Sequence, residues 1–361
     1  MTTLASRVRV TGEAPGAVTT PGGGSVGTER QGDSFSLLTQ LDGHQKVVTG
    51  IALPSGSDKL YTASKDETLR IWDCASGQDL GVGTKGCVSL ILQNHPCLCS
   101  LAVELKTHCT GVLNPGGEVG CMISEGPWLL VGMPNLVKAW NIQTNVDLSL
   151  TGPVGQVYSL VVGTDLLFAG TQDGSILVWR YNTATNCFDP AASLTGHTLA
   201  VVSLYVGANR LYSGSMDNSI KVWSLDNLQC VQTLTEHTSV VMSLICWDQF
   251  LLSCSLDNTV KIWAATQGGN LEVTYTHKEE YGVLALCGVH DAQAKPVLLC
   301  SCNDNSLHLY DLPSFTERGK ILAKQEIRSI QIGPGGIFFT GDGTGQVKVW
   351  KWSTQPTAIH P

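Results

Sequence analysis

Charged side chains are scarce in this sequence of 361 residues: Asp, Glu, Lys and Arg make up 14% of it, against roughly 25% in an average globular protein. The sequence has no run of basic residues, and its net charge of −8 opposes broad contact with a phosphate backbone. It also lacks an apolar run of roughly 18 residues, a secretory leader and an Asn-x-Ser/Thr sequon. We therefore expect an intracellular protein of the nucleus or cytoplasm that has no membrane contact and does not bind nucleic acid through this chain alone.

The cysteines do not indicate a disulfide framework. There are 13 of them, an odd number, and several lie inside apolar strand patterns. Examples are Cys246, Cys254, Cys287 and Cys300. Cys87, Cys97, Cys99, His108 and Cys109 also cluster in the sequence, but no two of these cysteines have the two-to-four-residue spacing of a zinc site. We expect the cysteines to be reduced and to pack as small apolar side chains, and we expect no metal or other cofactor.

A seven-residue motif recurs along the chain; it starts with Asp and ends with an aromatic residue. The five clear copies are Asp66–Trp72, Asp173–Trp179, Asp217–Trp223, Asp257–Trp263 and Asp304–Tyr310, and two weaker copies end at Trp140 and Trp350. The spacings between the seven closing residues are 68, 39, 44, 40, 47 and 40. Repeats of about 40–45 residues with an Asp turn and an alternating strand are typical of β-propellers.

The repeats predict an all-β fold, a seven-bladed β-propeller of four-stranded antiparallel blades over residues 35–352. Only three strand patterns follow Pro313, so we expect the N-terminal strand at residues 37–41 to close the last blade. The Gly-, Thr- and Ala-rich residues 1–34 are expected to be a disordered tail, and residues 353–361 a C-terminal tail. The long first spacing predicts an insertion at residues 79–108, which should be dispensable for folding.

Three of the repeats contain a set of one His, one Ser, one Asp and one Trp. These sets are His44, Ser64, Asp66, Trp72; His197, Ser215, Asp217, Trp223; and His237, Ser255, Asp257, Trp263. A single set would resemble a Ser-His-Asp catalytic group, whereas an enzyme has no need of three. The recurrence favours a structural hydrogen-bond relay and a protein without catalytic activity. In the repeat that ends at Tyr310, His277 and Asp304 take the His and Asp places and Cys302 replaces the Ser.

Residues beside these sets are candidates for binding a partner, because they should point outward where the His and Asp side chains point inward. The candidates are Lys65, Gln172, Met216, Leu256 and Asn303 before the Asp positions, and Lys46, Leu199, Ser239 and Glu279 two residues after the His positions. Leu199, Met216 and Leu256 would form an apolar patch, of the kind that often marks a contact site. The alternative is that each of these side chains packs against its own turn.

The Gly-His dipeptides, the Asp turns and the closing Trp residues resemble the WD-repeat (tryptophan-aspartate repeat) family from about residue 35 to 352. More narrowly, residues 43–58, 165–173 and 326–336 resemble plant proteins that join a CCCH zinc finger to WD repeats. The resemblance implies a monomeric scaffold that binds other proteins. The alternative that it implies is a regulator associated with RNA or other nucleic acid, although no CCCH segment precedes the repeats in this sequence.

Overall fold

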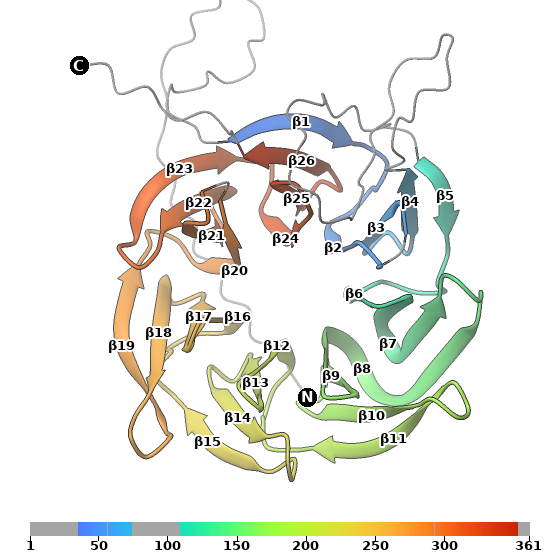
Figure 1. The fold of residues 1–361 in the computed structure, drawn as a ribbon, viewed down its shortest axis with the longest axis horizontal. Coiled ribbons are helices and arrows are strands. Elements are labelled where there is room, and N and C mark those ends of the chain that lie inside the picture. The colour runs from blue at the N-terminus through green and yellow to red at the C-terminus, as the bar shows by residue number, and fades with distance from the viewer. Residues whose placement is uncertain (1–34, 56, 74–108, 292, 353–361) are drawn as a thin grey trace, which may run out of the picture. The chain divides into compact units, whose positions relative to one another are not determined.

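The computed structural model describes residues 35–55, 57–73, 109–291 and 293–352, all within one compact unit, Asp33–Pro361. They form 26 β-strands, which hydrogen bonds join into six antiparallel sheets, five of four strands and one of six. Figure 1 shows these sheets following one another around a central axis. Among the described residues there is no helix that is long and apolar enough to span a membrane.

Four of the four-stranded sheets are each made from consecutive strands. The first contains β2 (Val48–Ala52), β3 (Lys59–Ser64), β4 (Leu69–Asp73) and β5 (Cys109–Leu113). The second contains β12 (Val201–Gly207), β13 (Arg210–Ser215), β14 (Ile220–Ser224) and β15 (Cys230–Leu234). The third contains β16 (Val241–Trp247), β17 (Phe250–Ser255), β18 (Thr259–Ala265) and β19 (Leu271–Lys278). The fourth contains β20 (Val283–His290), β21 (Pro296–Cys302), β22 (Ser306–Asp311) and β23 (Thr316–Leu322).

The fifth four-stranded sheet combines the two ends of the described chain. It contains β24 (Ile327–Ile332), β25 (Ile337–Asp342), β26 (Val347–Trp352) and β1 (Phe35–Leu41). β1 pairs antiparallel with β26, from Phe35 opposite Trp352 to Leu41 opposite Val347. The expected tails at 1–34 and 353–361 and the expected insertion at 79–108 lie outside the described residues.

The prediction of seven separate four-stranded blades is wrong, because one sheet has six strands. It contains β6 (Cys121–Glu125), β7 (Trp128–Asn141), β8 (Asp147–Gly163), β9 (Leu166–Thr171), β10 (Ile176–Asn182) and β11 (Cys187–Leu194). The cause is β8, a continuous strand of 17 residues. Its first part pairs with β7, as far as Gln156 opposite Pro134, and its second part pairs with β9 from Val157 onward. Where the chain has a Gly-His loop before β2 and before β12, this segment stays extended and joins two groups of strands into one sheet.

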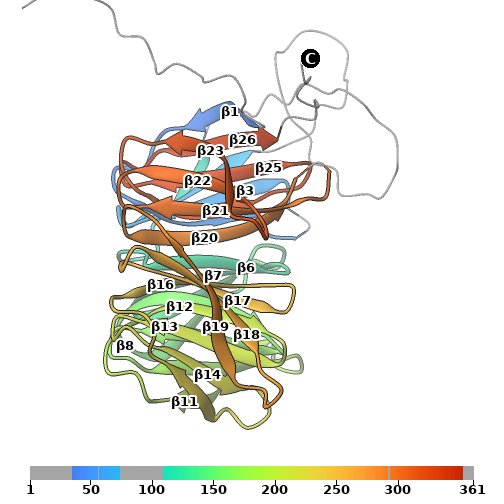
Figure 2. The ribbon, with the colours of Figure 1, turned by 90° about the vertical axis from the view of Figure 1, so that its left-hand side faces the viewer.

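The apolar core lies between neighbouring sheets. For example, Phe168 and Ile176 of the six-stranded sheet form one buried cluster with Leu211 and Trp223 of the next sheet. The inner strands β20, β16 and β12 contact one another in turn, and Figure 2 shows them one above the other. Each sheet thereby covers the apolar face of its neighbour, which is how repeat units bury a core that none could bury alone.

The Asp turns form for a local reason. In the turn that follows β13, the Asp217 carboxylate accepts the Ser219 backbone N–H at 2.9 Å, an Asx turn. The intervening Asn218 has φ 69°, a left-handed conformation that Asn and Gly adopt most easily. The matching turn before β10 has Gly174 at φ 89°. The repeated Asp-Asn and Asp-Gly pairs therefore specify tight turns that hold the Asp side chain against the end of the sheet.

Candidate functional site

A hydrogen-bond relay crosses the sheet of β12–β15. The His197 Nδ1 lies 2.9 Å from the Asp217 Oδ2, and the His197 Nε2 lies 2.8 Å from the Ser213 Oγ. The Trp223 Nε1–H donates to the same Ser213 oxygen at 2.9 Å. The relay thus ties the loop before β12, the strand β13, the turn after it and the strand β14 through one buried hydroxyl group.

The same relay is present in two other sheets. In the β2–β5 sheet the hydroxyl belongs to Thr62, 2.8 Å from the His44 Nε2 and 2.9 Å from the Trp72 Nε1, and His44 Nδ1 lies 3.0 Å from Asp66. In the β16–β19 sheet the hydroxyl belongs to Ser253, with the corresponding bonds to His237 and Trp263 at 2.7 and 2.8 Å. There the His237–Asp257 distance is 2.7 Å.

The serine predicted for each relay is not the one that bridges His and Trp. Ser215 instead donates to the Leu199 carbonyl oxygen at 3.0 Å and accepts the Asp217 backbone N–H at 3.1 Å. Ser64 and Ser255 make the equivalent bonds, to the carbonyl oxygens of Lys46 and Ser239. The bridging residue lies two positions earlier on the same strand, so it is on the same face of the sheet. A hydroxyl residue at this position in all three repeats was the feature of the sequence that could have identified the bridge.

The ionisation states of Asp217 and His197 determine which atoms of the relay carry protons. Burial opposes ionisation of Asp217, but hydrogen bonds from Ser219, Thr198 and His197 outweigh burial and lower the pKa of this carboxyl to about 2. Burial lowers the pKa of His197 below its ordinary value of 6.5, against the raising effect of Asp217. A neutral His197 facing an ionised Asp217 donates from Nδ1, so its Nε2 accepts the Ser213 hydroxyl proton.

This proton arrangement has the polarity of a Ser-His-Asp catalytic group, but its surroundings differ from those of an active site. The Ser213 side chain is fully buried, with 0% exposure. Its oxygen already accepts the Trp223 indole N–H. A hydroxyl enclosed in this way has no path to a substrate, so the relay can fix loops and strands but cannot attack an acyl group.

The relay is altered in the sheet of β20–β23, where the expected His277 does not occupy the His place. Glu279 lies four residues before β20, as His237 lies four residues before β16. Its carboxylate Oε1 accepts the Tyr310 hydroxyl at 2.8 Å. The Glu279 side chain is 7% exposed, so the expectation that it points outward is wrong. The sequence spacing of Glu279 from the inner strand β20, four residues, could have assigned it to the His place.

The other candidates for partner binding have different exposures. Lys46, Lys65, Gln172, Leu199, Met216 and Asn303 are exposed, whereas Ser239 and Leu256 are half-buried. The two exposed apolar members, Leu199 and Met216, are 52% and 40% exposed. A Cβ added at Gly282 would lie 3.0 Å from the Leu256 side chain, so Leu256 packs toward the neighbouring sheet. The role of these residues in binding stays a prediction.

Comparisons with known proteins agree with this architecture. A family model described as "WD domain, G-beta repeat" matches residues 35–73, 188–224 and 228–264. The crystal structure of the WD40 β-propeller domain of Doa1 superposes with a TM-score of 0.68 at 18% identity, over 89% of this chain and 97% of that chain. The fold and the relays define this protein as a WD-repeat β-propeller.

Close relatives identify a particular family within the WD-repeat proteins. Zinc finger CCCH domain-containing protein 48 of Arabidopsis thaliana is 85% identical over 91% of this chain and 70% of its own length. Protein 63 of that series, from the same plant, is 78% identical over 92% of this chain and 69% of its own length. The chain belongs to the family of these WD-repeat CCCH zinc-finger proteins. A weaker likeness, 28% over 43% of this chain and 32% of the relative, links it to the U3 snoRNP-associated protein-like EMB2271 of A. thaliana.

Proposed function

We propose that the protein is a non-catalytic scaffold that binds other proteins beside the Asp turns of its propeller. One observation carries the proposal: two exposed apolar side chains emerge from two loops that are bonded together. The Met216 backbone N–H donates to the Ala200 carbonyl oxygen at 2.9 Å, and Ser215 bonds to the Leu199 carbonyl oxygen. Leu199 and Met216 therefore project from adjoining backbone segments.

The relay beneath these loops supports a role in binding. Asp217 accepts the Thr198 backbone N–H at 3.0 Å and contacts His197 at 2.9 Å, so the same carboxylate holds the Leu199 loop and the turn of Met216. A surface that is already rigid loses little conformational entropy when a partner binds. Exposed apolar side chains on rigid loops are suited to act as anchors in such an interface.

The test is the double substitution Leu199→Glu, Met216→Glu. Val231→Glu on the outer strand β15 of the same sheet is the matched control, since Val231 is also an exposed apolar residue, at 51%. Partners captured by the wild-type protein would be purified, and their affinity for the three proteins measured by calorimetry. We expect the double variant to melt like the wild type and to lose at least one partner that the control retains. Equal affinities for all three proteins would refute this surface.

Association with RNA is the second candidate, and the partial likeness to a U3 snoRNP-associated protein favours testing it. The net charge of −8 opposes it, because affinity for a phosphate backbone comes mainly from charge neutralisation by Lys and Arg. The measurement is binding of purified protein to a labelled RNA over a salt series. A steep fall in affinity with salt supports RNA contacts, and binding of proteins that persists after nuclease treatment supports the scaffold.

A further inference from the structure

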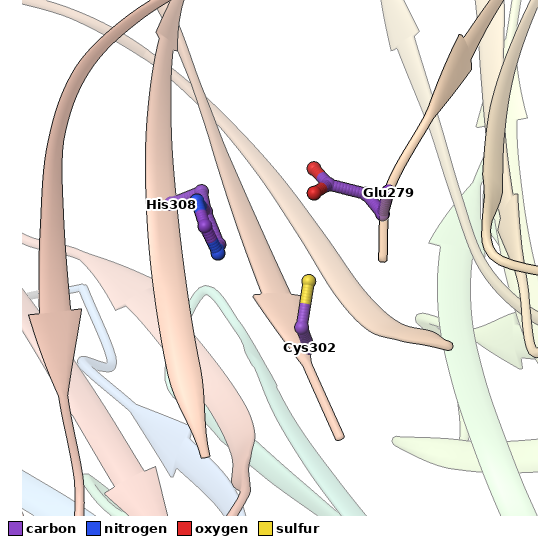
Figure 3. Close-up of side chains that lie close together, drawn as sticks. All are labelled: Glu279, Cys302 and His308. Atoms are coloured by element: carbon purple, nitrogen blue, oxygen red, sulfur yellow. The ribbon is translucent and has the colours of Figure 1, made fainter. Parts of the chain in front are cut away.

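Three side chains that can bind a metal meet at one end of the sheet of β20–β23. They are Glu279 in the loop after β19, Cys302 at the end of β21 and His308 on β22. Their nearest ligand atoms all lie within 4.8 Å of one another, and Figure 3 shows the carboxylate, the thiol and the imidazole turned toward a common centre. The three come from different elements, so the fold, and not local sequence, assembles the cluster.

The corresponding positions of the neighbouring sheet hold residues that cannot bind a cation together. Glu279 takes the place of His237, and Cys302 ends β21 as Ser255 ends β17. His308 lies opposite Cys300 in the strand register, as Lys261 lies opposite Ser253. A His, a Ser and a positively charged Lys are thus replaced by a Glu, a Cys and a His. The changes from Ser to Cys and from Lys to His add metal ligands, the change from His to Glu exchanges one ligand type for another, and all three occur in one sheet.

Further contacts orient two of the three ligands. The His308 Nδ1 lies 2.9 Å from the Glu317 Oε1, which leaves Nε2 for a metal. A carboxylate on the second ring nitrogen is the usual support of a metal-binding histidine. The Tyr310 hydroxyl donates to the Glu279 Oε1 at 2.8 Å, which fixes the carboxylate and leaves Oε2 for a metal.

The side chain of His277 lies beside the cluster. Within the described part of the chain, the buried His277 Nε2 makes no hydrogen bond of ordinary geometry, and its ion-pair contact with the Glu279 Oε1 is long, at 3.5 Å. Its ring is held in place by stacking on Phe315 at 4.8 Å. A buried polar atom that is weakly bonded is costly, so a further polar group next to Glu279, such as a metal-bound water, would improve the bonding of this nitrogen.

We propose that Glu279, Cys302 and His308 bind one Zn²⁺ ion. Zinc prefers thiolate, imidazole and carboxylate ligands in tetrahedral geometry, with ligand bonds of about 2.0–2.3 Å and hence about 3.5 Å between ligand atoms. The observed separations, all within 4.8 Å, exceed that value by about 1.3 Å at most. On binding, the Cys302 thiol loses its proton to solvent. The thiolate and the carboxylate then neutralise the ion, which suits a site whose Cys302 is 1% exposed. A water occupies the fourth position.

The substitutions that test the site come from the neighbouring sheet. Cys302→Ser and His308→Lys install the residues that stand at these positions in the β16–β19 sheet, so both variants should fold. Cys300→Ser is the matched control, because it removes an adjacent buried thiol and installs the residue found at Ser253. Metal-free full-length proteins would be titrated with zinc against a chromophoric chelator, and with cobalt to observe the thiolate-to-metal charge-transfer band.

The wild type and Cys300→Ser should bind one more equivalent of zinc than Cys302→Ser or His308→Lys, whose affinity at this site should fall by more than 100-fold. Glu317→Gln, which alters the support of His308, should weaken zinc binding roughly 10–100-fold. The cobalt charge-transfer band of this site should disappear in Cys302→Ser and should remain in Cys300→Ser. Equal zinc stoichiometry in the wild type, Cys302→Ser and His308→Lys would overturn the proposal, as would a loss of binding in Cys300→Ser alone.

Discussion

Removal of the Ser213 hydroxyl should destabilise the protein more than removal of the Ser215 hydroxyl, two residues away. Ser213→Ala leaves the Trp223 Nε1 and the His197 Nε2 without a partner, and both atoms belong to buried side chains. An unsatisfied buried group costs about 1–3 kcal/mol. The variant should therefore lose about 2–6 kcal/mol of unfolding free energy from the two groups together.

Ser215→Ala removes two hydrogen bonds as well, but its partners can reach water. They are the carbonyl oxygen of the exposed Leu199 and the backbone N–H of Asp217, in part-buried bonds. The expected loss is about 1–3 kcal/mol, from two replaceable hydrogen bonds with net values of about 0.5–1.5 kcal/mol each. Ser213→Thr serves as the control, because Thr62 performs this role in the first sheet and the hydroxyl is retained.

The assay is urea unfolding of the three variants and the wild type, followed by circular dichroism, with hydrogen exchange of the Trp223 indole as a local readout. Ser213→Ala should show the largest drop in unfolding free energy and the fastest indole exchange. If Ser215→Ala is destabilised as much as Ser213→Ala, the hub of the relay is not where the structure places it.

Three further outcomes follow from other contacts. Asp217→Ala and Asp257→Ala should each lower the melting temperature more than Thr344→Ala, because each removes the acceptor of a buried histidine; equal melting curves would contradict this. Burial lowers the pKa of His44, His197 and His237 in the folded state, so the unfolded chain binds more protons below its histidine value of about 6.5. The unfolding free energy should then fall as the pH drops from about 7.5 to about 5.5, and denaturant melts at both values check the sign. Phe35→Ala should cost about 3–5 kcal/mol, because Phe35 packs edge-on against Phe338, Trp350 and Trp352; a melting temperature equal to that of Leu37→Ala, an exposed position on the same strand, would refute this.

The sequence alone determined the repeat, the all-β class and the family, because each depends on short-range patterns. Strand alternation and the Asp turns follow from side-chain period and local backbone preference, as the φ of 69° at Asn218 shows. The pairs His197–Asp217 and His237–Asp257 were also predictable, since recurrence at a constant spacing marks residues with a shared role.

Only the tertiary structure decided which hydroxyl joins His to Trp, because Ser213 and Ser215 share one face of β13 and differ only in what lies across from them. It decided that β8 continues from one group of strands into the next, since the strand stays extended only because its first part pairs with β7 and its second part with β9. It also turned Glu279 inward, where Tyr310 satisfies its carboxylate. The cluster of Glu279, Cys302 and His308 has the same origin: its members are up to 29 residues apart in sequence, and only the packing of three elements brings their ligand atoms together.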